Sequence, residues 1–154
     1  RMTAVPDLTV TRQGTANAAD GTAYVCTALR NVDTVTAMDA TRTVAGPTSS
    51  TNPDPPAIVT VTNTAWVMPL CGSQVNDASI TVPSGYINGT SATANDMNDI
   101  STGSATLEIA SPGSQDPATY TTWASGAWYC ITIAVRPADP PLGGAKRMLT
   151  LGVG

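Results

Sequence analysis

Histidine and phenylalanine are absent from this sequence of 154 residues, and lysine and glutamate occur once each, as Lys146 and Glu108. Without histidine, the chain can form neither a Ser-His-Asp nor a Cys-His arrangement, the usual means of activating a nucleophile. Three cysteines without histidine also cannot build a usual tetrahedral zinc site. We therefore expect no enzymatic activity, no catalytic residues, no metal site and no cofactor.

Carboxylates are the remaining groups that could support catalysis, because glycosidases use a pair of them. The chain has eleven, and most of the aspartates lie in turn-like contexts such as Asp20-Gly21 and Asp54-Pro55. Aspartate is favoured at turns because its side chain bonds to the nearby backbone. We interpret these residues as turn residues rather than as a catalytic pair.

Charge is also scarce: only 12% of the residues are charged, against about a quarter in ordinary soluble domains. The net charge is −4, and the basic residues are scattered along the chain instead of forming the cluster typical of nucleic-acid binders. We therefore expect no nucleic-acid partner. A weakly charged surface lacks the repulsion that keeps proteins monomeric, which favours assembly with copies of itself or with a neighbouring structural protein.

Long apolar runs are missing as well, and no stretch of 18 apolar residues could span a membrane. The first residues, RMTAVP, lack the apolar stretch of a secretory signal. We expect an extracellular or virion protein, with either a signal removed from the mature chain or release by another route.

Threonine, valine, glycine and proline dominate what is present. Threonine and valine suit a pleated, half-buried surface, and 25 glycines and prolines separate short alternating runs. The pattern predicts an all-β protein: a single β-sandwich or jelly-roll-like domain over residues 1–154, with long loops. Strands are expected at residues 7–12, 22–29, 32–37, 57–62, 65–70, 78–82, 105–110, 118–123, 127–135 and 148–152.

Loops are expected at residues 46–56, which contain four prolines, and at residues 83–103 and 136–144. Residues 91–100 are the one weak candidate for a helix. The larger apolar residues of the clearest strands should form the core. These are Val25, Ile58, Val61, Trp66, Ile80, Leu107, Ile109, Trp128, Ile131, Ile133 and Val135.

The two ends of the chain, residues 1–12 and 145–154, are strand-like pieces separated from the body by flexible or proline-bearing residues. A detached strand can satisfy its backbone groups on the sheet edge of a neighbour. We predict that these arms are exchanged between subunits, with pairing inside their own sandwich as the alternative.

Cys26, Cys71 and Cys130 all lie in strand-like runs. An odd number leaves one thiol unpaired or bonded to another chain. A Cys26–Cys130 bridge is one interpretation, and three small buried side chains are the other.

Four of the seven aromatic residues fall within residues 120–129: Tyr120, Trp123, Trp128 and Tyr129. Such a cluster can fill a core that has no phenylalanine, anchor a subunit interface or stack on the rings of a carbohydrate. All three interpretations stay open.

Residues 95–99, Asn95-Asp96-Met97-Asn98-Asp99, place four oxygen-bearing side chains together. Calcium prefers clustered oxygens, but such residues also cap turns. Asn88-Gly89-Thr90 matches the glycosylation sequon, a short pattern expected by chance in this composition.

Together these features predict a non-enzymatic structural subunit, such as a virion coat protein, a capsid-decoration protein or a cell-surface filament protein. The alternative is a secreted carbohydrate-binding or adhesin module.

Overall fold

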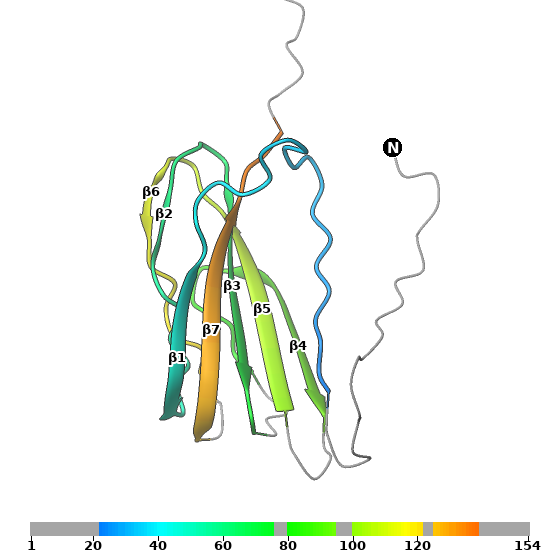
Figure 1. The fold of residues 1–154 in the computed structure, drawn as a ribbon, viewed down its shortest axis with the longest axis vertical. Helices are drawn as coiled ribbons and strands as arrows, with labels where there is room; N and C mark the ends of the chain where they lie inside the picture. The colour runs from blue at the N-terminus through cyan, green and yellow to red at the C-terminus, as the bar shows by residue number, and fades with distance from the viewer. Residues whose placement is uncertain (1–21, 76–79, 95–99, 122–124, 139–154) are drawn as a thin grey trace, which may run out of the picture.

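A computed structural model describes residues 22–75, 80–94, 100–121 and 125–138. Within these ranges the protein is all-β and forms two antiparallel sheets. The larger sheet has the order β1-β7-β3-β5-β4, and the smaller pairs β2 with β6 (Figure 1). The strands are β1 (Thr43–Ser50), β2 (Ile58–Thr60), β3 (Trp66–Ser73), β4 (Ile87–Ala94), β5 (Ile100–Glu108), β6 (Gly113–Gln115) and β7 (Gly126–Val135).

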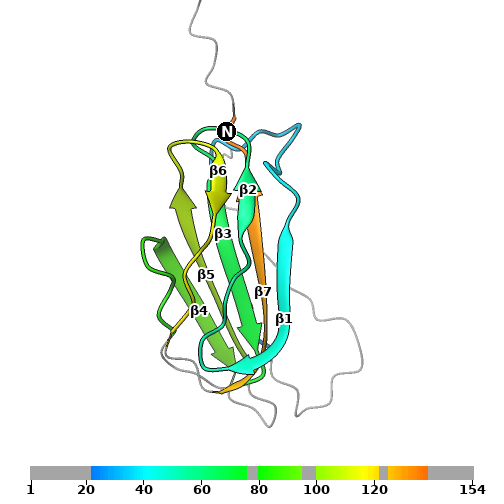
Figure 2. The ribbon, with the colours of Figure 1, turned by 90° about the vertical axis from the view of Figure 1, so that its left-hand side faces the viewer.

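The smaller sheet lies against one face of the larger, which we call the inner face (Figure 2). One core cluster joins Ile58 of β2 to Val67 of β3 and Ala134 of β7. A second contains Tyr120 and Trp128 together with Cys71 and Cys130. The core therefore sits between the two sheets.

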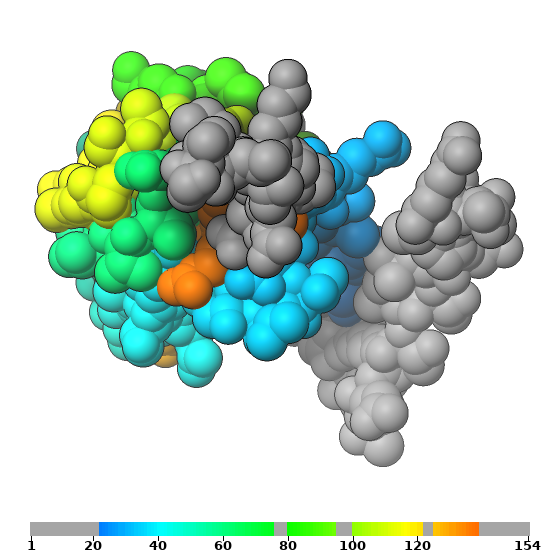
Figure 3. Space-filling view, turned by 90° about the horizontal axis from the view of Figure 1, so that it is seen from above, coloured from blue at the N-terminus to red at the C-terminus, as the bar shows by residue number. Residues whose placement is uncertain are grey.

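Residues 22–30 run along the opposite, outer face of the larger sheet (Figure 1). The chain then reaches the end of β7, where Met38 bridges Val135 and Val32 bridges Pro137. Seen from above, residues 30–40 (light blue) lie against the end of β7 (orange; Figure 3). This irregular segment continues the edge of the sheet beyond β1, alongside the last residues of β7.

The four strands predicted at residues 57–62, 65–70, 105–110 and 127–135 are confirmed as β2, β3, β5 and β7, with shifted ends. The described parts of four others, at residues 22–29, 32–37, 78–82 and 118–123, form no regular strand, although Val32, Thr81 and Thr121 make isolated bridges. The predicted strands at residues 7–12 and 148–152, and with them both terminal arms, lie outside the described residues.

Two predicted loops are wrong in part, because each contains strand residues, and the predicted helix is wrong. Residues 43–50 form β1, whose proline is accommodated because β1 is an edge strand with a register shift between Ala45 and Thr48. Pro53 and Pro55 are fully buried rather than exposed. Residues 83–103 contain all of β4 and the start of β5, so residues 91–94 are strand instead of helix.

Candidate functional site

Strand β7 determines which side chains the larger sheet presents on each face. Trp128, Cys130 and Ala134 are buried on the inner face. Because side chains alternate along a strand, Tyr129, Ile131 and Ile133 lie on the outer face. Ile131 and Ile133 are only half-buried, so the predicted inward face of this strand is wrong. On the inner face, Trp128 and Cys130 of β7 pack with Tyr120 and Cys71.

The neighbouring strands add apolar side chains to the same outer face. Val44 of β1 and Leu70 of β3 both pair with Ile131, and directly opposed residues share a face. We name Val44, Leu70, Tyr129, Ile131 and Ile133 the outer strip. Val44 is 57% exposed and Tyr129 is 54% exposed, and the strip contains no charged residue.

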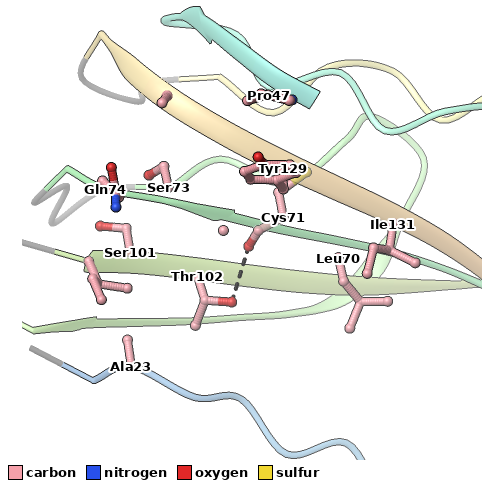
Figure 4. Close-up of a pocket in the computed structure, with 13 residues that line it drawn as sticks. Ala23, Pro47, Leu70, Cys71, Ser73, Gln74, Ser101, Thr102, Tyr129 and Ile131 are labelled. Carbon is pink, nitrogen blue, oxygen red and sulfur yellow. Dashed lines mark hydrogen bonds between the residues drawn. The ribbon is translucent and has the colours of Figure 1, made fainter. Parts of the chain in front are cut away.

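A shallow groove of about 630 Å³ opens beside the outer strip. Leu70, Tyr129 and Ile131 line one part of it, and Thr102 and Ala23 line another (Figure 4). The Thr102 hydroxyl donates to the Cys71 carbonyl at 3.1 Å. The groove is therefore mostly apolar, with hydroxyl groups at its margin.

The disulfide joins Cys71 to Cys130, on β3 and β7, and Cys26 is a free, exposed cysteine. The Cys26–Cys130 interpretation is therefore wrong, and so is the interpretation of three buried thiols. Cys71 and Cys130 are opposed directly in the β3–β7 register, a relation that depends on strand pairing and has no local sequence signal.

The aromatic cluster divides between the two faces. Tyr120 and Trp128 are buried in the core, where the Tyr120 hydroxyl donates to the Pro69 carbonyl at 2.9 Å. Burial, and to a smaller extent the nearby Tyr86, raises the pKa of Tyr120. Tyr129 points outward, and Trp123 lies outside the described residues. The core interpretation is confirmed for Tyr120 and Trp128 and contradicted for Tyr129.

Among the residues that the structure describes, one charged side chain is buried. Asp39 accepts hydrogen bonds from the backbone N–H groups of Val61 and Thr62, at 2.7 and 3.4 Å, and from the Thr62 hydroxyl. Arg136 Nε lies 3.5 Å from its carboxylate. The hydrogen bonds connect the segment before β1 to the chain between β2 and β3, so the Asp39–Arg136 pair has a structural role.

Two further pKa values depart from the ordinary range. Backbone N–H groups of Val35 and Thr36 bond to Asp33 and lower the pKa of that exposed carboxyl. Burial, followed by the negative charge of Asp116, raises the pKa of Tyr86 to about 12. Neither group lines the groove, so these shifts concern a turn and the packing of Tyr86.

The described part of the chain contains no cluster of three or more cysteine, aspartate or glutamate side chains able to hold a metal ion, and no helix there is long and apolar enough to cross a membrane. The proposed calcium ligands at residues 95–99 lie outside the described ranges. The Asn88 amide of the sequon donates to the Thr106 hydroxyl at 3.0 Å.

No known protein family, curated protein or solved structure matches this chain.

Proposed function

We propose that this protein is a non-enzymatic structural subunit that assembles with copies of itself or decorates a larger assembly, as coat, capsid-decoration and surface-filament proteins do. In this proposal its two sheets form one β-sandwich or jelly-roll-like domain. The observation that carries the proposal is the outer strip, an uncharged apolar surface in the middle of a sheet face.

The energetic argument starts from the exposed side chains. Fully burying one large apolar side chain is worth about 1.5–3 kcal/mol. Val44 and Tyr129 are both more than half exposed, and Ile131, Ile133 and Leu70 are half-buried. Covering this strip with a neighbouring subunit removes it from water without removing any charge from water.

Two further features support a protein that assembles in an extracellular or virion location. Disulfides persist in oxidising environments and are rare in the cytosol, and the Cys71–Cys130 bridge lies within the core. The low overall charge is tolerated best on a surface that neighbours cover. Both features agree with a protein that works as part of an assembly outside the cell.

The test compares two double variants by sedimentation velocity over a concentration series. Val44→Thr/Tyr129→Thr makes the outer strip polar while keeping strand-forming residues. Val59→Thr/Val61→Thr is the matched control, because those valines are 62% and 59% exposed on and beside β2. The proposal expects oligomers for the wild type and the control, and at least about tenfold weaker association for the strip variant. A wild type that is monomeric throughout contradicts assembly with copies of itself.

One observation favours a second candidate, carbohydrate binding. The exposed Tyr129 ring lies in the groove with Gln74 and Thr102 nearby (Figure 4), and aromatic faces with polar neighbours suit sugar rings. Retardation of the wild type on polysaccharide gels, lost in Tyr129→Ala, would support this candidate. Migration equal to that of Tyr129→Ala on every gel would contradict it.

A further inference from the structure

The two edges of the larger sheet differ in their ability to accept another strand. Edge strands avoid unwanted pairing through prolines, charges and bulges. Strand β1 contains Pro47 within a register shift, so its edge is interrupted. Strand β4 has a shift between Ile87 and Thr90, but residues 90–94 then pair regularly with β5. Those residues, TSATA, include neither a proline nor a charge.

The free side of β4 carries backbone groups that need partners. In an antiparallel strand, the N–H and C=O groups of alternate residues point to opposite sides. Strand β5 satisfies one side, and no described segment forms a backbone ladder on the other. Thr90, Ser91 and Thr93 are also exposed, so a second strand could approach. Figure 2 shows β4 and β1 at opposite sides of the sheet.

We propose that residues 90–94 of β4 pair antiparallel with the same residues of a second copy, which joins the two larger sheets into one continuous sheet. This inference rests on the proposed function, because it names a surface through which the subunit assembles. This edge surface differs from the outer strip, which lies on a face of the sheet and not at its edge.

The sequence of this edge is self-complementary. A two-fold pairing centred on Ala92 places Ser91 opposite Thr93 of the partner subunit, and Thr90 opposite the partner's Ala94. Serine and threonine hydroxyls form favourable cross-strand pairs. Alanine at the centre lets the two backbones approach without a clash, and no like charges meet.

The test introduces lysine at two opposed positions. In Ser91→Lys/Thr93→Lys each lysine faces a lysine of the partner subunit, and opposed like charges destabilise strand pairing. The matched control is Thr48→Lys/Ser49→Lys on β1, where both residues are exposed and the change in net charge is equal. We expect the dimer Kd to rise at least about tenfold, or about 1.4 kcal/mol, for the β4 variant and less than twofold for the control.

A charge-reversal experiment tests the register itself. Ser91→Asp/Thr93→Asp should associate as weakly as the lysine variant, and an equimolar mixture of the two should recover a heterodimer. Hydrogen exchange of the wild type gives a readout that needs no variant: the amides within residues 90–94 that point away from β5 should exchange more slowly as concentration rises.

The outcomes separate the pairing from the function. A wild type that stays monomeric overturns the pairing and assembly with copies of itself, and leaves only decoration of another assembly. Oligomers that the β4 lysines do not weaken overturn the pairing and leave the structural function standing. Oligomers lost on deletion of residues 145–154, with residues 90–94 unprotected in the wild type, also overturn the pairing, in favour of a terminal arm.

Discussion

Replacing Asp39 with alanine should destabilise the protein more than replacing its ion-pair partner Arg136 with methionine. The Asp39 side chain is fully buried and accepts three hydrogen bonds, from the N–H groups of Val61 and Thr62 and from the Thr62 hydroxyl. Without the carboxylate these donors lose their acceptor. Each unsatisfied buried group costs about 1–3 kcal/mol, and Asp39→Ala leaves three donors without their acceptor.

We therefore expect Asp39→Ala to lower the free energy of unfolding by about 3–5 kcal/mol, a large part of the roughly 5–15 kcal/mol typical of a domain. Asp39→Asn keeps one acceptor oxygen and should cost less. The Arg136 side chain is 29% exposed, so water screens its charge, and Arg136→Met should cost only about 1 kcal/mol.

The measurement is urea denaturation of the three variants, followed by tryptophan fluorescence and circular dichroism. The expected order of destabilisation is Asp39→Ala, then Asp39→Asn, then Arg136→Met. If Asp39→Ala cost less than about 1 kcal/mol, or less than Arg136→Met, the hydrogen bonds assigned to Asp39 would not be stabilising the fold.

Three further predictions follow from single sites. In the native protein only the Cys26 thiol should react with a thiol reagent, and losing the β3–β7 disulfide, which closes a 59-residue separation, should cost about 4 kcal/mol; three reactive thiols would contradict this. Gly46 has φ of 110° and an added Cβ would overlap the Trp128 carbonyl oxygen, so Gly46→Ala should lower the melting temperature, and an unchanged value would refute the close approach. The pKa of Tyr86 is raised to about 12 by burial and by Asp116, so the free energy of unfolding should fall as pH rises from about 10. Tyr86→Phe should show a smaller fall, and an equal fall would mean that the ionisation of Tyr86 does not cause it.

The all-β class could be predicted because threonine-rich and valine-rich alternation is a local signal. Strands β2, β3, β5 and β7 follow it. Strand β4, with the sequence INGTSATA, could not be predicted, because its small polar residues carry no apolar alternation. It is a strand because β5 offers a partner for its backbone, which is a tertiary effect.

The outer strip could be predicted only in part. The residues on both faces of β7 include apolar side chains, so the sequence alone favoured Ile131 and Ile133 as the buried ones. In the structure the core contains Trp128, Cys130 and Ala134 instead. Ile58, Ile109, Trp128 and Val135 are buried as predicted, whereas Val61 is 59% exposed. Val25, Trp66, Ile80 and Leu107 are half-buried. Which face a strand buries depends on the strands beside it in the sheet. The neighbours of β7 are β1 and β3, which are distant from it in the sequence.

Negative-stain electron microscopy of the purified wild-type protein, combined with its mass in solution, tests the structural function most directly. The account predicts regular particles, filaments or discrete oligomers that the outer-strip variant Val44→Thr/Tyr129→Thr fails to form. A protein that stays monomeric at every concentration and is retarded by polysaccharide gels would contradict it and favour the carbohydrate-binding alternative.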